Sequence, residues 1–237
     1  MAIAAPFGYD EIVPLEKSHR VLMPSGTTPS FCRTINALAV SVGEFVAAAR
    51  DYPIVFASAD AGKSFAPVIL LGLQAGVNLF IDESGEWDRS TYFPAYVRRF
   101  PFCLSKERVV CVVKSYIDAS GVPLFHVWGE PTPRWKAAQD LLAGFDADLE
   151  RTAQMCAALV RLELLEPFSV QVKDAPEIQV GGMARVAEPK LRALAPARLK
   201  ALNDKGFLGL VYAHLHSLES FNRLVARWNR RRASAPG

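Results

Sequence analysis

Residues 53–81 read PIVFASADAGKSFAPVILLGLQAGVNLFI, and this stretch decides the fold class. Pro53–Ser58 and Ala66–Leu73 are apolar segments separated by Asp60–Gly62, which is typical of a turn between two strands. Val77–Ile81 is a third apolar segment, and the glycine just before it suits a tight hairpin. Because strands joined by hairpins pair antiparallel, this stretch predicts an antiparallel sheet.

Further strands are predicted on the C-terminal side of this stretch. Arg108–Ile117 is rich in β-branched residues, and a turn after it leads into a strand at Pro123–Trp128. Phe168–Val172 and Ile178–Val180 predict two more, separated by a turn at Asp174. We therefore expect an antiparallel sheet of six or more strands.

Two long helices complete the predicted fold. Thr132 can cap a helix that has Pro133 in its first turn, and helical apolar spacing continues to Leu165. The last helix is expected at Phe207–Arg231, after Gly206 as the residue that ends the preceding helix. Two short helices are expected before it, at Pro189–Leu194 and Pro196–Lys205. The predicted class is α+β, with the sheet packed against a long central helix and a C-terminal helix.

Length and composition predict a single domain over residues 1–237, with an irregular N-terminal arm at 1–42 and a C-terminal helical part at 187–232. Hydrophobic residues make up 51% and charged residues 22%, as in an ordinary globular protein. The formal net charge of +3 is too small to indicate a nucleic-acid partner. The tail RWNRRR at 227–232 could contact nucleic acid or an acidic partner, but it is interpreted as a solvated helix end.

The N-terminus and the cysteines indicate a cytoplasmic protein. The first 17 residues have neither a basic region nor an unbroken apolar run, so we expect no signal peptide, and no apolar run elsewhere is long enough for membrane insertion. The four cysteines form no CxxC pair, which favours reduced and mostly buried thiols. Cys103 would be an activated nucleophile only if the Arg99 guanidinium lay against its thiol and lowered the thiol pKa.

No motif specifies a reaction, so no catalytic residue is assigned. Ala57–Ser64 reads ASADAGKS and fits a relaxed phosphate-binding loop, but Pro67 argues against the helix that such a loop requires. We interpret it as a hairpin loop with a solvated Lys63. His214 and His216 lie about 200° apart on a helix, so they cannot share a metal ion. We expect no metal site and no cofactor, and we favour a buried, hydrogen-bonded His214.

The best functional candidate is residues 76–102, GVNLFIDESGEWDRSTYFPAYVRRFPF. Tryptophan, tyrosine and arginine dominate the energetics of binding surfaces, and arginine can also pair with carboxylate or phosphate in a bidentate manner. The candidate binding residues are Trp87, Tyr92, Tyr96, Arg98, Arg99 and His214. The alternative is internal: the aromatics pack at the sheet edge and an arginine pairs with Asp82 or Asp118. If Arg98 and Arg99 lie in a strand, only one of them faces a given surface.

Several blocks together resemble the SapC-like family of bacterial proteins. They are DYPIVF at 51–56, GVNLFIDESGEW at 76–87, YFPAYVRRFPF at 92–102, PLFHVWGEPT at 123–132, LLEPF at 164–168, GGMARVAEPKL at 181–191 and LVYAHLHSL at 210–218. Their order covers the chain from about Tyr9 to Trp228. The resemblance implies an association with surface-layer gene clusters, and it supplies no catalytic residues.

Among three functions, we favour a non-catalytic accessory protein. It would bind a peptide or a peptide-modifying enzyme in the cytosol through a surface formed by Trp87, Tyr92 and Arg98. A protein or peptide is therefore the expected partner, and a homo-oligomer stays open.

Two alternatives belong to other classes of protein. The first is an enzyme acting on a peptide or a small molecule, whose site would join His214, Tyr92 and Arg98 to Asp82 or Glu130 in a concave pocket. The second is a surface-layer structural protein, which would assemble into sheets outside the cell.

Overall fold

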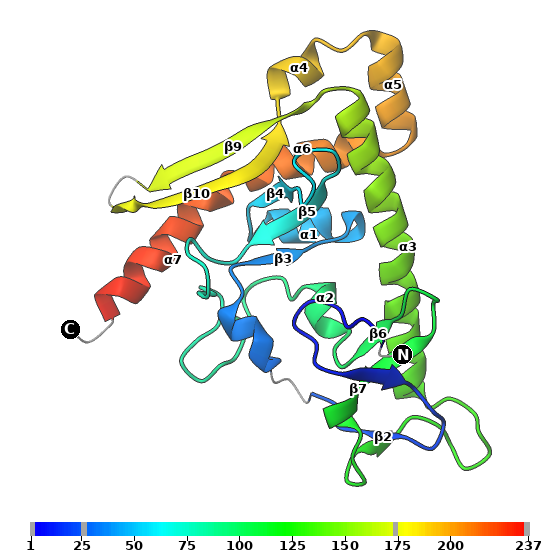
Figure 1. Ribbon diagram of the computed structural model, residues 1–237. Coiled ribbons are helices and arrows are strands. Elements are labelled where there is room, and N and C mark those ends of the chain that lie inside the picture. The colour runs from blue at the N-terminus through cyan, green and yellow to red at the C-terminus, as the bar shows by residue number, and fades with distance from the viewer. Residues whose placement is uncertain (1–2, 25–27, 173–174, 235–237) are drawn as a thin grey trace.

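The computed structural model describes residues 3–24, 28–172 and 175–234, and its architecture is the predicted α+β class (Figure 1). The largest sheet has five strands in the order β3-β5-β4-β10-β9, and all of its pairings are antiparallel. Its strands are β3 (Ala37–Ala39), β5 (Ala66–Leu70), β4 (Ile54–Ala57), β10 (Ala175–Val186) and β9 (Leu165–Val172). The prediction of six or more strands in one sheet is therefore wrong in its count.

The remaining described strands form two smaller antiparallel sheets. A three-stranded sheet has the order β1-β7-β6, and a two-stranded sheet pairs β2 with β8. Their bounds are β1 (Ile12–Pro14), β7 (Val110–Val113), β6 (Phe102–Leu104), β2 (Arg20–Val21) and β8 (Val122–Pro123). The N-terminal arm thus contributes the strands β1, β2 and β3, where the sequence suggested an irregular segment.

Strand β4 lies in the middle of the large sheet because both of its faces are apolar. Ile54, Val55 and Phe56 are all fully buried. On one side Ile54 pairs with Ile69 of β5, and on the other Phe56 pairs with Ala184 of β10. The hairpin predicted from residues 53–73 is confirmed, and the sheet joins it to a strand about 130 residues further along the chain.

Three predicted strands are wrong or shorter than expected. The strand predicted at 108–117 is β7, which spans only Val110–Val113 before the chain enters the 3-10 helix at Lys114–Tyr116. Residues 77–81 form only an isolated bridge, between Ile81 and Trp87. The Asn78 side chain explains the change: its Oδ1 accepts from the Phe80 N–H at 2.9 Å, and its Nδ2 donates to the Cys32 carbonyl at 2.8 Å. The strand predicted at 123–128 ends at Pro123, after which the chain forms a small hairpin.

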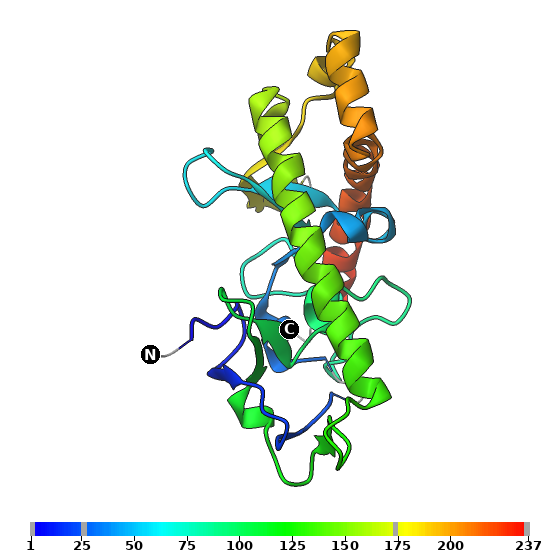
Figure 2. The ribbon, with the colours of Figure 1, turned by 90° about the vertical axis from the view of Figure 1, so that its right-hand side faces the viewer.

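Helix α3 (Pro133–Arg161) runs along one side of the molecule (Figure 2). Its N-terminus is as predicted, because the Thr132 Oγ1 accepts from the Trp135 N–H at 3.3 Å. The helix ends before the predicted Leu165, since Glu163 has a left-handed backbone with φ 54° and the chain then enters β9. The turn predicted at Asp174 lies outside the described residues.

The predicted last helix is two helices, α6 (Phe207–Ser217) and α7 (Ser220–Ser234). Serine hydroxyls at the break bond to the backbone of earlier segments: the Ser217 Oγ accepts from the Ile54 N–H at 2.9 Å, and the Ser220 Oγ donates to the Ala49 carbonyl at 3.2 Å. Before them, Gly206 adopts the left-handed φ of 69° that the sequence predicted. The shorter helices are η1 (Ser30–Thr34), η2 (Val42–Glu44), α1 (Phe45–Ala49), α2 (Ala95–Arg98), η3 (Lys114–Tyr116), α4 (Glu188–Arg192) and α5 (Pro196–Asp204).

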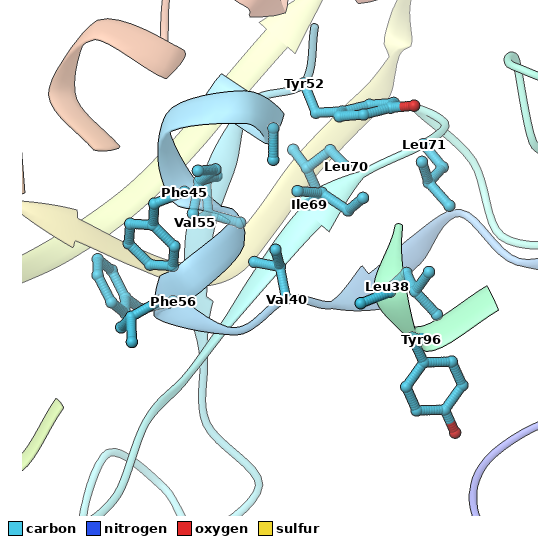
Figure 3. Packing of buried hydrophobic residues seen from close by; sticks show 14 of the residues in the cluster. Leu38, Val40, Phe45, Tyr52, Val55, Phe56, Ile69, Leu70, Leu71 and Tyr96 are labelled. Carbon is cyan, nitrogen blue, oxygen red and sulfur yellow. The ribbon is translucent and has the colours of Figure 1, made fainter. Parts of the chain in front are cut away.

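The core lies between the large sheet and the helices α1, α3 and α6. Phe45, Tyr52 and Leu70 are fully buried there (Figure 3). Burial of each such side chain contributes roughly 1.5–3 kcal/mol. All four cysteines are free and buried, which confirms the prediction from their spacing. Burial raises the pKa of Cys103 to about 11 and outweighs the effect of Arg99, so Cys103 is not an activated thiolate.

Candidate functional site

Trp87 is a core residue and not the exposed ring that the sequence suggested. It is only 5% exposed, and its Nε1–H donates to the Tyr52 hydroxyl at 3.0 Å. Its backbone N–H donates to the Thr28 hydroxyl at 2.8 Å, and its ring packs edge-on against Phe93 with centroids 5.5 Å apart. An indole needs one hydrogen-bond acceptor when it is buried, and the Tyr52 hydroxyl supplies it. The Trp87 ring is therefore not available to a partner.

Tyr96 and Arg99 also lie inside the molecule. Arg99 is 9% exposed, and its guanidinium carbon lies 4.3 Å from the Tyr96 ring centroid and 4.5 Å from that of Phe145. The Tyr96 hydroxyl donates to the Phe7 carbonyl at 2.7 Å. The cation is thus held by aromatic faces and not by Asp82 or Asp118, whose carboxylates accept hydrogen bonds within their own turns.

Tyr92 and Arg98 form a short polar chain that reaches the surface. The buried Glu44 carboxylate accepts from the Tyr92 hydroxyl at 3.1 Å, and the Arg98 Nη2 donates to that hydroxyl at 3.0 Å. Burial raises the pKa of Tyr92 to about 12, and the Glu44 charge acts in the same direction. Arg98 is exposed while Arg99 is buried, so only one of the pair faces solvent, although both belong to the turn of helix α2 and not to a strand.

A pocket of about 330 Å³ lies beside Trp87, where the 79–89 segment meets helix α7. Inside it the Arg227 Nη2 donates to the Asp88 carboxylate at 2.6 Å, and its guanidinium carbon lies 4.3 Å from the Phe80 ring centroid. Burial alone would raise the pKa of Asp88, but hydrogen bonds from Ser90 and Arg227 outweigh it and hold that pKa below its ordinary value. The pocket's central cation is therefore already paired.

Three arginines of α7 contact backbone carbonyls at position 50 and in the 78–79 segment. The sequence analysis missed these contacts. Arg223 donates to the Arg50 carbonyl at 2.7 Å, and Arg231 donates to the Asn78 carbonyl at 2.8 Å. Arg227 approaches the Leu79 carbonyl at 3.5 Å. We call these three residues the α7 arginine row. Their i, i+4, i+8 spacing was the available signal, and it corrects the interpretation of this segment as a solvated helix end.

His214 is sealed in the core, as the buried interpretation predicted. Its exposure is 0%, its Nε2 accepts from the Val186 N–H at 3.0 Å, and its Nδ1–H donates to the Ile54 carbonyl at 2.9 Å. Burial lowers its pKa to about 4, so the imidazole is neutral at pH 7. Its partners are backbone groups, and neither Asp82 nor Glu130 is among them. The enzyme site that joined His214 to Tyr92, Arg98 and an acid is therefore not formed.

The 57–64 segment is a hairpin loop and not a phosphate cradle. The Asp60 carboxylate accepts from the Ser64 hydroxyl at 2.6 Å and from the Ser64 N–H at 2.8 Å. Strand β5 follows, so the helix N-terminus that a phosphate-binding loop needs is absent from this part of the described chain. Over residues 3–24, 28–172 and 175–234, no three His, Cys, Asp or Glu residues gather as a metal site would require. In the same ranges, no helix is long and apolar enough to cross a bilayer.

The most exposed aromatic side chain belongs to a hairpin that the sequence analysis assigned to a strand. We call it the 126–129 tip. Its turn is closed by the Gly129 N–H donating to the His126 carbonyl at 2.8 Å, and Gly129 has φ 83°. At its apex Val127 is 95% exposed and Trp128 is 91% exposed. The glycine that follows Val-Trp was the available turn signal.

The conformation of the 126–129 tip is held by contacts at the base of its hairpin. Phe125 packs against the buried Trp135 of α3 with ring centroids 6.1 Å apart, and the Lys17 Nζ lies 5.8 Å from the Phe125 ring centroid. The His126 N–H donates to the Glu130 carbonyl at 2.8 Å. An ordered base therefore carries two unburied apolar side chains, Val127 and Trp128.

A family model described as SapC matches residues 16–224 of the chain. The chain belongs to the SapC family. The resemblance drawn from the sequence blocks is thereby confirmed over the fold that has just been described. No curated protein and no solved structure matches this SapC-family chain. What the protein binds must therefore be argued from its own geometry.

Proposed function

We propose that this protein is a non-catalytic accessory protein that binds a protein or peptide partner through the 126–129 tip. The observation that carries the proposal is the exposure of Val127 and Trp128, at 95% and 91%. Turns favour Gly, Asn, Asp and Ser at such positions, so the local backbone does not require a valine and a tryptophan there. Neither side chain stabilises the folded monomer by burial.

The chemistry of the 126–129 tip suits a protein surface with a pocket. Tryptophan is the residue type most enriched among the few that dominate binding energy. Because the hairpin is already ordered, little conformational entropy remains to be lost on binding. Of the residues selected from the sequence, Arg98 and Tyr92 reach the surface, and we propose Arg98 as a secondary contact.

The test compares partner recovery by the full chain and by matched variants. A tagged wild-type protein, Trp128→Ala and Val46→Ala are purified from the native cells, and co-purifying proteins are quantified by mass spectrometry. Val46 is 74% exposed on α1, so Val46→Ala truncates an exposed apolar side chain elsewhere on the surface. We expect Trp128→Ala to lose a specific partner at least tenfold, as for a residue that contributes about 1.4 kcal/mol or more, while Val46→Ala retains it.

Equal recovery by wild type and Trp128→Ala would refute the role of the tip. Analytical ultracentrifugation of the same purified proteins shows whether the partner is a different protein or a second copy of this chain. If wild type self-associates and Trp128→Ala does not, the partner is a second copy of this chain. Arg98→Ala tests the secondary contact, with an expected loss smaller than that of Trp128→Ala.

A further inference from the structure

A second pocket, of about 290 Å³, lies between the C-terminal end of α3 and helix α5. The two helices lie side by side here in both views (Figures 1 and 2). Its floor is apolar: Ala158 and Leu202 are each 3% exposed, and Leu162 is half-buried. The exposed side chains of Arg161, Arg198 and Lys205 line the pocket around this floor. We call it the α3–α5 pocket.

The cations of the α3–α5 pocket lack acidic partners. No carboxylate in the described part of the chain pairs with Arg161, Arg198 or Lys205. On α5, by contrast, Lys200 pairs with Asp204 at 2.6 Å. An anion in the pocket would relieve the repulsion among these charges.

The position of Arg198 is not explained by the helix dipole, unlike the positions of Arg161 and Lys205. Arg161 and Lys205 lie at the C-terminal ends of their helices, where a cation is favourable without any ligand. Arg198 lies in the first turn of α5, at the positive end of the helix dipole, and that turn contains no acid. A cation there is locally unfavourable, so the α5 helix itself does not account for it.

We propose that the α3–α5 pocket binds a small amphipathic anion, with an apolar chain on the floor and a carboxylate held by Arg198 and Arg161. An arginine fork matches carboxylate geometry, and the apolar floor adds affinity that a bare anion would not gain. The pocket takes a ligand of a different class from the partner of the 126–129 tip. This proposal does not depend on the proposed function, and either can be refuted without the other.

The test is isothermal titration calorimetry of the full chain with decanoate as the probe. Acetate carries the charge without the chain, and 1-decanol carries the chain without the charge. We expect saturable one-to-one binding of decanoate, and no saturable binding of either control at the same concentrations. Arg198→Gln should weaken decanoate binding at least tenfold. Lys200→Gln should leave it unchanged, because Lys200 does not line the pocket and pairs with Asp204.

A second variant tests the apolar part without changing charge. Ala201 is exposed and lines the pocket, so Ala201→Phe fills it and should also weaken binding at least tenfold while the thermal midpoint stays that of the wild type. Three results would overturn the proposal. They are no saturable decanoate binding, wild-type affinity in Arg198→Gln, and acetate binding as tightly as decanoate.

Discussion

Trp87 and Trp128 have the same side chain and opposite environments. One is 5% exposed and hydrogen-bonded to Tyr52, and the other is 91% exposed. Trp87→Phe removes a buried hydrogen bond, so we expect the free energy of unfolding to fall by about 1–3 kcal/mol. Trp128→Phe should change it by less than about 0.5 kcal/mol, as for a surface substitution. Urea denaturation of both variants makes the comparison, and equal losses would contradict it.

His214 makes the folded state sensitive to acid. Its pKa in the folded protein is lowered from 6.5 to about 4 by burial. Between these two pH values the unfolded chain binds a proton at this imidazole and the folded protein does not. We therefore expect the free energy of unfolding to fall as pH falls through that window, since protonation favours the unfolded state.

The matched control for this prediction is two residues away. His216 is exposed on the same helix, so His216→Gln serves as the control for removing an imidazole from the surface of α6. His214→Gln should reduce that dependence, and NMR of the labelled imidazole should show no protonation of wild-type His214 above about pH 5. A His214 imidazole that titrates near pH 6.5 would contradict the structure.

At the level of elements, the α7 arginine row holds a helix to the loops beneath it. Arg227→Lys keeps the charge but loses the planar group that contacts Asp88 and lies over Phe80. We expect it to lower the free energy of unfolding by about 1–2 kcal/mol, a value discounted because the ion pair is partly exposed. Arg134→Lys, at an exposed position in α3, should have no measurable effect in the same denaturation experiment.

Elements with local signals could be predicted from the sequence. The β4–β5 hairpin follows from two apolar runs around a turn, and the start of α3 follows from Thr132 and Pro133. Residues 77–81 looked like a strand because they form a short apolar segment, but the Asn78 side chain bonds backbone groups that a strand partner would have needed. The break between α6 and α7 depends on contacts of Ser217 and Ser220 with residues about 160–170 positions away, which no local pattern records.

The same limit explains the outcome at the candidate site. Composition singled out a segment rich in Trp, Tyr and Arg, but composition does not determine burial. Arg99 is buried against aromatic rings contributed by Tyr96 and by Phe145 of α3, so its environment depends on packing across the fold. Val127 and Trp128 resembled the end of a strand, and although Gly129 signals the turn, no local pattern records how exposed the two side chains are.

At the scale of the whole molecule, the large sheet joins distant parts of the chain. Strand β4 pairs with β5 on one side and with β10 on the other, and helix α6 contacts both β4 and β10. We therefore expect one cooperative unfolding transition for the full chain. Far-UV circular dichroism and tryptophan fluorescence should give the same midpoint in urea. Two separate transitions would show that the halves fold as independent domains.

The length of α3 fixes a distance within this molecule. At about 1.5 Å per residue, its 29 residues span about 43 Å. The 126–129 tip immediately precedes its first turn, and the α3–α5 pocket lies at its last turn. A ligand small enough for the pocket cannot touch a partner held at the tip, so both can be occupied at once. With both sites occupied, the protein would hold its partner and its small ligand about four nanometres apart.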